Sequence, residues 1–368
     1  MSELSDLSEL SVRVITWNVG DSPKHFTTAD QWGAELQKWP LGNDDIIFIT
    51  LQETSKELGE IFADALKKGL AGYQIFHEGE GPKLGRDFYV FSYLCVKNDH
   101  KVKINTKPIP NDKKDKTIDA TCIYKFGLCT KPSVGIGAKI NGTKLIFVGS
   151  HLPINTKDKE NASLGYKERI EAIKKIQMEV IQDVEKAIEG SDVVFWTGDF
   201  NMRIQSDDKE QLEIALKKEL SDFAEYDTVN VRRTCRIKEI GETEDRSKYI
   251  DLRLSDDETK FDTKRIASYC DRVIYKDPGH KFEPTEYYSW PNADTPKNNV
   301  PQSIVHSDHD MVVLVGKIKT ETKTETKQTK QIKSNKPKQN PVSTGGSFFD
   351  KYMKYKTKYL ALKMYAGQ

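Results

Sequence analysis

The sequence predicts an α/β fold built as one large domain, and three observations support this. The chain has 368 residues, of which 37% are hydrophobic and 31% charged, a composition typical of globular proteins with a polar surface. Strand-like and helix-like segments alternate from residue 11 to residue 318. Within that range we find neither an internal repeat nor a linker that would divide the domain.

Seven short segments are predicted to be strands because each is rich in β-branched or aromatic residues and is bounded by polar residues, Gly or Pro. They are residues 12–17, 46–51, 88–96, 144–149, 193–197, 272–275 and 311–315. The clearest helix is predicted over about 165–189, where apolar residues recur every three or four positions and Gly190 follows. Similar spacing predicts helices over 58–66 and 212–220.

The two ends of the chain differ from the body. Residues 1–10 are expected to be a flexible N-terminus, and the Lys/Thr/Gln-rich residues 319–346 a disordered linker. Residues 347–368 combine Phe, Tyr and Leu with Lys and are predicted to form a basic, aromatic helix. This helix could lie on an anionic membrane, dock onto a partner or the body, or be a tolerated appendage.

Charge is distributed unevenly along the chain. The last fifty residues contain 12 Lys, no Arg and 3 acidic residues. They carry +9, so the rest of a chain with net charge +1 carries −8. An acidic body is poorly suited to bind nucleic acid, because that binding depends on neutralising phosphates. We therefore expect no nucleic-acid partner.

The cysteines and the N-terminus bear on location. Five cysteines without a C-x-x-C pair argue against a disulfide framework or a zinc site, and favour a reducing compartment. The N-terminus has no basic start followed by an apolar core, and no apolar run approaches the length of a membrane span. We expect an intracellular, cytoplasmic protein, peripheral at membranes if the basic tail binds them.

Chemically active side chains recur at the ends of the predicted strands. Asn18, Glu53, His151 and Asp199 each follow a strand, and Asn201 lies two positions after Asp199. Loops that leave strand ends commonly carry ligand-binding and catalytic groups. Two further groups precede strands instead, namely Asp308-His309 and Asp271. The strand after His309 must then run antiparallel to the others for its site to share the same edge.

This set of residues suits metal-assisted hydrolysis of a phosphate ester. Oxygen atoms of Glu53, Asn18 and Asp308 could bind Mg²⁺, which would neutralise charge on the phosphate. Asp199, held by Asn201, could activate the attacking water, and His309, held by Asp271, could donate to the phosphate. The chain has neither a C-x5-R phosphate loop nor a G-x-x-x-x-G-K-[ST] motif.

These motifs, in this order, resemble the endonuclease/exonuclease/phosphatase superfamily, and within it the inositol polyphosphate 5-phosphatases. Residues 196–203 match the W-x-G-D-x-N-x-R signature of that family. Residues 265–273 are similar to its second signature, R-x-P-[SA]-[WY]-C-D-R-[IV], with Ala267 in place of the proline. The resemblance covers residues 11–318 and implies a DNase I-like fold. That fold is a four-layer sandwich of two mixed β-sheets between helices.

The resemblance also implies roles. Glu53, with Asn18 and Asp308, would bind Mg²⁺. Asp199 and Asn201 would activate and position water. His151 and His309 would contact the phosphate, and Asp271 would orient His309. Arg203 and Arg272 could bind substrate phosphates or brace loops, since a guanidinium does either. The family's N-K-G-G segment survives only as Lys131, and its P-T-Y-K motif is replaced by Arg233-Thr234-Cys235-Arg236, so Lys131 and Arg236 are candidate substrate contacts.

The function implied is an Mg²⁺-dependent hydrolase that removes the 5-phosphate of phosphoinositides or soluble inositol polyphosphates by direct attack of water. We expect it to be monomeric. One alternative is a nuclease of the same superfamily, such as an abasic-site endonuclease. Another is a catalytically silent phosphoinositide-binding module.

Overall fold

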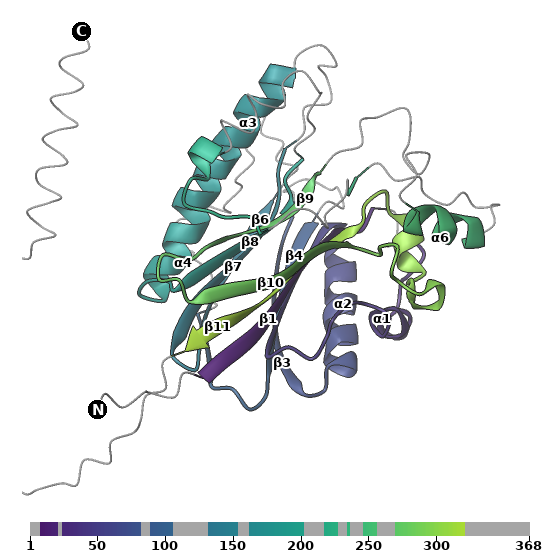
Figure 1. The fold of residues 1–368 in the computed structure, drawn as a ribbon, viewed down its shortest axis with the longest axis horizontal. Coiled ribbons are helices and arrows are strands. Elements are labelled where there is room, and N and C mark those ends of the chain that lie inside the picture. The colour runs from purple at the N-terminus through teal and green to yellow at the C-terminus, as the bar shows by residue number, and fades with distance from the viewer. Residues whose placement is uncertain are drawn as a thin grey trace, which may run out of the picture. The chain divides into compact units, whose positions relative to one another are not determined.

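Two mixed β-sheets form the centre of the fold (Figure 1). The computed structural model describes residues 8–20, 24–81, 89–105, 132–153, 162–201, 217–226, 234–235, 246–255 and 269–320. These lie in one compact unit, Met1–Thr322. The expectations about residues 321–368 lie outside the described residues.

The larger sheet has six strands and the smaller has five. In order across the larger sheet they are β10 (Phe282–Trp290), β11 (Met311–Thr320), β1 (Ser8–Asn18), β2 (Ile46–Thr54), β4 (Tyr89–Lys97) and β3 (Tyr73–Glu80). In order across the smaller they are β5 (Val102–Asn105), β6 (Ser133–Ile140), β7 (Thr143–His151), β8 (Val193–Asp199) and β9 (Asp271–Lys276). Parallel pairing joins β1 to β2 and β7 to β8, and the other described pairs are antiparallel.

The two sheets pack face to face through a shared apolar core. Phe48 of β2 and Phe147 of β7 are both fully buried, with ring centroids 4.9 Å apart. The rings of Phe147 and Phe195 of β8 stack at 5.5 Å. Side chains on a strand alternate between faces. The opposite face of each sheet carries a second set of buried apolar side chains, such as Trp17 on the larger sheet and Trp196 on the smaller. These are covered by helices.

Helices α1 (Ala29–Leu36) and α2 (Lys56–Gly69) cover the outer face of the larger sheet (Figure 1). Ser55 begins α2 by accepting a hydrogen bond from the Leu58 amide at 3.0 Å, and Leu58 and Phe62 face the core. On the smaller sheet, α3 (Ala162–Lys175) continues through a π-helical stretch (Ile176–Ile181) into α4 (Gln182–Ala187). The predicted four-layer α/β sandwich is confirmed. No helix among the described residues is long and apolar enough to cross a membrane.

All seven predicted strands are present, and β11 is antiparallel to β1 as expected. The helices predicted over 58–66 and 165–189 are also present, whereas most of the helix predicted over 212–220 lies outside the described residues. The predicted domain boundaries at 11 and 318 fall inside the β1–β11 ladder, which extends to the pair Ser8 and Thr320. Residues 8–10 and 319–320 are part of this ladder because they pair with each other, although their polar composition does not predict a strand.

Candidate active site

The residues predicted to be catalytic or to bind a metal meet where edges of the two sheets face each other. Strand register aligns three of them across the smaller sheet, since His151 of β7 is opposite Asp199 of β8, and Asp199 is opposite Asp271 of β9. On the larger sheet, Asn18 ends β1 and Glu53 lies near the end of β2. His309 precedes β11 by two residues. Antiparallel pairing of β11 with β1 brings it to the same edge.

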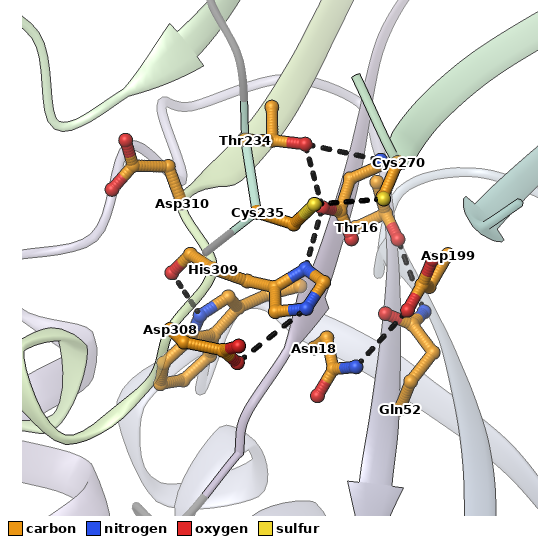
Figure 2. Close-up of polar contacts among 12 residues, drawn as sticks. Thr16, Asn18, Gln52, Asp199, Thr234, Cys235, Cys270, Asp308, His309 and Asp310 are labelled. Carbon is orange, nitrogen blue, oxygen red and sulfur yellow. Dashed lines mark hydrogen bonds and ion pairs between the residues drawn. The ribbon is translucent and has the colours of Figure 1, made fainter. Parts of the chain in front are cut away.

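Asp199 is at the centre of this arrangement and is almost fully buried. Its Oδ1 atom accepts a hydrogen bond from the Asn201 amide at 2.8 Å, and its Oδ2 accepts from Asn18 Nδ2 at 3.2 Å (Figure 2). His151 Nε2 lies 3.2 Å from the same Oδ2 atom. Three neighbours therefore fix the orientation of the carboxylate. Asn201 itself is held by a bond from Nδ2 to the Leu152 carbonyl at 2.7 Å.

Gly198 explains why the strand before Asp199 can pack so closely on its neighbour. Its φ is +150°, and a Cβ at this position would lie 1.9 Å from the carbonyl oxygen of Ser150. Any side chain would push β8 away from β7, and Asp199 away from His151. The glycine of the Gly198-Asp199 pair is thus required by close backbone approach.

Asp271 and His309 form a buried pair. His309 Nδ1 and Asp271 Oδ2 are 2.7 Å apart, and the pair lies within the protein. The Thr234 hydroxyl donates to the same Asp271 oxygen at 2.7 Å. The bond from Nδ1 fixes the orientation of the His309 ring. The second ring nitrogen, Nε2, points away from Asp271 and lies 3.5 Å from Asp308 Oδ1 (Figure 2). The contact between His309 and Asp271 expected from the sequence is present.

Burial and charge shift the pKa values of this pair. Burial raises the pKa of Asp271 to about 6, because the neighbouring His309 offsets the loss of water only in part. Burial lowers the pKa of His309, but the carboxylates of Asp271 and Asp308 outweigh this effect and raise the pKa well above 6.5. At neutral pH the pair is therefore an ionised carboxylate and an imidazolium, and the imidazolium can donate a hydrogen bond from Nε2.

Glu53 reaches the site through an unusual backbone conformation. Its φ is +59°, and the pairing of β2 with β4 shifts register between Leu51 and Thr54. This left-handed conformation costs about 1–2 kcal/mol for a residue with a Cβ. The carboxylate, 28% exposed, lies 3.7 Å from His151 Nε2. Residues held in strained conformations concentrate at functional sites, which supports a role for Glu53.

Several groups could hold a metal ion here. Ligand atoms of Asp199, Asp271 and His309 lie within 4.8 Å of one another. Because His309 is protonated at neutral pH, the carboxylate oxygens are the atoms of this group that can bind a metal. Two buried oxygens, Gln52 Oε1 and Asp271 Oδ1, have no hydrogen-bond donor among the residues that the structure describes. Oxygen atoms without donors, together with the partly exposed carboxylate of Glu53, suit a hard divalent cation. The sequence-predicted ligands Glu53, Asn18 and Asp308 border the same group, so the residues present fit a metal.

The loop carrying Asp308 and His309 is anchored by a residue that the sequence did not indicate. Arg253 of α6 (Arg246–Leu254) is buried, and its Nε donates to Asp310 Oδ1 at 2.7 Å. Its Nη atoms donate to the carbonyls of Ile304, Ser307 and His309. The Ser307 hydroxyl adds a bond to the Asn18 carbonyl at 2.6 Å. No local motif marks an arginine whose partners lie more than fifty residues away.

The predicted substrate contacts are described only in part. Arg272 faces away from Asp271 because the two are neighbours on a strand. Its Nη1 pairs with Glu225 Oε2 at 2.7 Å, a contact that favours the bracing role. The other three, Lys131, Arg203 and Arg236, lie outside the described residues. Thr234 lies two positions before Arg236 in the chain, and its sequence context gives no sign that it bonds to Asp271.

Two sheets lie between helices, and acidic and histidine side chains converge where edges of these sheets face each other. The chain belongs to endonuclease/exonuclease/phosphatase family 2, whose family model matches residues 15–315. The enzymes named in that description are hydrolases that cleave phosphate esters.

Solved structures to which the chain is similar include three different proteins. The inositol polyphosphate 5-phosphatase domain of SPsynaptojanin, with inositol (1,4)-bisphosphate and calcium ion, is 16% identical, with 86% of each chain covered and a TM-score of 0.47. Truncated Caenorhabditis elegans TDP2 is 16% identical, covering 84% of this chain and 97% of that one, at 0.45. The Cimex nitrophorin ferrous NO complex is 15% identical, covering 85% and 99%, at 0.48. Because these scores are under 0.5, the family assignment rests on the family model alone.

Proposed function

We propose that the protein is an Mg²⁺-dependent phosphatase that removes the 5-phosphate from phosphoinositides or soluble inositol polyphosphates. The observation that carries the proposal is the convergence of two carboxylates, two imidazoles and two carboxamides at the facing sheet edges. They are Asn18, Glu53, His151, Asp199, Asn201 and His309. The choice of an inositol ring rests on the two 5-phosphatase signatures in the sequence.

The chain's own residues supply the steps of such a reaction. Asp199, its two oxygens held by Asn201 and Asn18, accepts the proton of the attacking water. His309, kept as an imidazolium by Asp271, donates from Nε2 to an oxygen of the scissile phosphate, and His151 contacts the same phosphate. Mg²⁺ bound through Glu53, Asn18 and Asp308 would neutralise charge on the phosphate.

The test compares phosphate release from a panel of substrates, with Mg²⁺ and with a chelator. The panel contains soluble inositol polyphosphates, short-chain phosphatidylinositol 4,5-bisphosphate and, for the nuclease alternative, duplex DNA with one abasic site. We expect Mg²⁺-dependent phosphate release from 5-phosphorylated compounds and no nicking of DNA. Nicking without phosphate release would replace the phosphatase proposal by the nuclease.

Replacing the proposed base separates catalysis from binding. Asp199→Ala should reduce phosphate release by about 10⁴-fold or more while lipid binding, measured by vesicle sedimentation, is kept. Asp64→Ala is the matched control, since Asp64 is an exposed carboxylate paired only with Lys67 in the hydrogen bonds described. Turnover retained by Asp199→Ala would refute the assigned base, and binding without turnover in the unmodified protein would favour a silent module.

We also propose that the basic residues after Thr320 bind anionic membranes and so hold the enzyme near lipid substrates. Each basic residue near such a surface contributes about 1 kcal/mol. Sedimentation with anionic vesicles should pull down the full chain and leave a chain ending at Thr320 in solution. Equal binding by both would remove this role from the tail.

A further inference from the structure

Two buried cysteines lie in contact directly behind the proposed catalytic pair. Cys235 and Cys270 are fully buried, and their sulfur atoms are 2.8 Å apart although 35 positions separate them in the chain (Figure 2). Neither is in a disulfide bond. A disulfide bond is about 2.04 Å long, so the two sulfurs need to approach by only about 0.8 Å to bond.

Each cysteine is linked through the backbone to a catalytic candidate. Cys270 immediately precedes Asp271. Cys235 forms an isolated antiparallel bridge with His309 and follows Thr234, whose hydroxyl bonds to Asp271 Oδ2. A covalent bond between the sulfurs would therefore connect the two backbone segments that hold Asp271 and His309 in place.

We propose that Cys235 and Cys270 are an oxidation site that controls this enzyme, with the dithiol as the active form. A peroxide oxidises one thiol to a sulfenic acid and is itself reduced to water. The second thiol then attacks that sulfur, forming the S–S bond and releasing a second water. A small dithiol reverses the step by thiol–disulfide exchange. In reducing compartments, disulfides are commonly transient and redox-sensing, consistent with two cysteines that are in contact but not in a disulfide bond.

The oxidised form should be the less active one. Any part of this approach that the side chains do not take up displaces the backbone segments that hold Asp271 and His309, and catalytic groups tolerate displacements of only about 0.5 Å. A misplacement near 1 Å can cost about 10²-fold in rate. We therefore expect kcat to fall by about 100-fold on oxidation, with recovery on reduction. This effect on rate rests on the proposed function, whereas formation of the disulfide does not.

Burial sets the speed of the reaction. Neither thiol is exposed, so peroxide reaches them through local opening of the protein, and oxidation should be slow. Cys95 is the internal comparison, because it is equally buried but lies in the core beneath α1 and α2, and burial raises the pKa of its thiol to about 12. It has no sulfur partner among the described residues, and it should not form a disulfide.

The experiment treats the full chain with hydrogen peroxide, blocks remaining thiols, and maps peptides by mass spectrometry without reduction. It is done in a Cys122→Ser/Cys129→Ser background, so that Cys95, Cys235 and Cys270 are the thiols present. We expect a peptide pair joined through Cys235 and Cys270 that has lost two hydrogen atoms and separates after dithiothreitol treatment. Absence of this pair, or a pair that includes Cys95, would overturn the proposal.

Activity is measured on the same samples. Phosphate release should fall about 100-fold with peroxide and return with dithiothreitol, while Cys235→Ala and, separately, Cys270→Ser remain insensitive to peroxide. Cys95→Ala is the matched control and should respond like the parent. A mapped disulfide with unchanged activity would refute control of the enzyme. If the reduced protein releases no phosphate from any substrate, the proposed function fails, and the peptide map alone still decides whether the disulfide forms.

Discussion

Arg253 offers the most quantitative test of how the site is held together. Its guanidinium and the Asp310 carboxylate are 2.7 Å apart, with exposed fractions of 2% and 0%. Removing one partner of such a buried pair strands the other charge and costs about 3–5 kcal/mol. The carbonyls of Ser307 and His309 lose their donors as well. For Arg253→Met, which keeps a long side chain, we expect a loss of about 4 kcal/mol.

That loss is a large fraction of a typical free energy of unfolding of about 5–15 kcal/mol. It is measured by urea denaturation, followed by the fluorescence of the 5 tryptophans in a chelating buffer. Adding Asp310→Asn removes the stranded charge, so the double variant should regain about 1–2 kcal/mol relative to Arg253→Met. Lys67→Met breaks an exposed pair with Asp64 and should change stability by less than about 0.5 kcal/mol.

The same variant should also affect turnover. Arg253 fixes the carbonyls on both sides of Asp308, so its loss releases the loop that carries His309. A fold that still forms should release phosphate at least about tenfold more slowly. A loss of stability under about 1 kcal/mol, or a double variant less stable than the single one, would refute the view that this ion pair organises the loop.

Three further predictions concern the site itself. Activity should fall at acid pH with an apparent pKa near 6, because Asp271 takes up a proton as the pH drops through its raised pKa and then no longer stabilises the His309 cation. Asp271→Asn should lower the rate and abolish this acid-side fall in activity. A flat profile between pH 5 and 8 would contradict the assignment. Glu53→Gln should raise the half-saturating Mg²⁺ concentration by about tenfold or more, whereas Glu53→Gly, which suits the left-handed backbone, should keep or raise the melting temperature. Unchanged Mg²⁺ dependence in both would remove Glu53 from the metal site. Gly198→Ala should lower the free energy of unfolding, measured by urea denaturation, by about 3 kcal/mol or more, because its Cβ would meet a backbone oxygen. Gly33→Ala is the control: a Cβ there has open space in α1, so this variant should be slightly more stable than the parent. Equal effects of the two substitutions would refute the steric argument.

The sequence predicted the buried strands well because their apolar runs are continuous. It missed β3, β5, β6 and β10. β3 (Tyr73–Glu80) lies at a sheet edge and mixes polar residues with Ile75 and Phe76. β6 (Ser133–Ile140) contains two glycines, and β10 (Phe282–Trp290) carries Pro284 next to a register shift. These strands are defined by their partners rather than by their own composition.

Only part of the candidate site could be predicted from the sequence. Residues at strand ends, such as Asp199 and His151, could be found because the chain order places them at one edge. The anchoring contacts of Arg253 and Thr234 could not, because they depend on where α6 and an isolated bridge residue lie in space. The left-handed conformation of Glu53 could not be predicted either, because the residues next to it in the sequence do not indicate it.

The proposed catalytic groups are divided between the two sheets. Asn18 and Glu53 come from one, and His151, Asp199 and Asp271 from the other, so the site depends on the apolar layer between the sheets, to which Phe48 and Phe147 belong, as well as on the hydrogen bond from Asn18 to Asp199. A partially loosened molecule could retain every ladder of backbone hydrogen bonds and still have no working site. Under mild denaturant, loss of turnover should therefore come before loss of the far-ultraviolet circular dichroism signal, which makes the enzyme a sensitive reporter of its own interlayer packing.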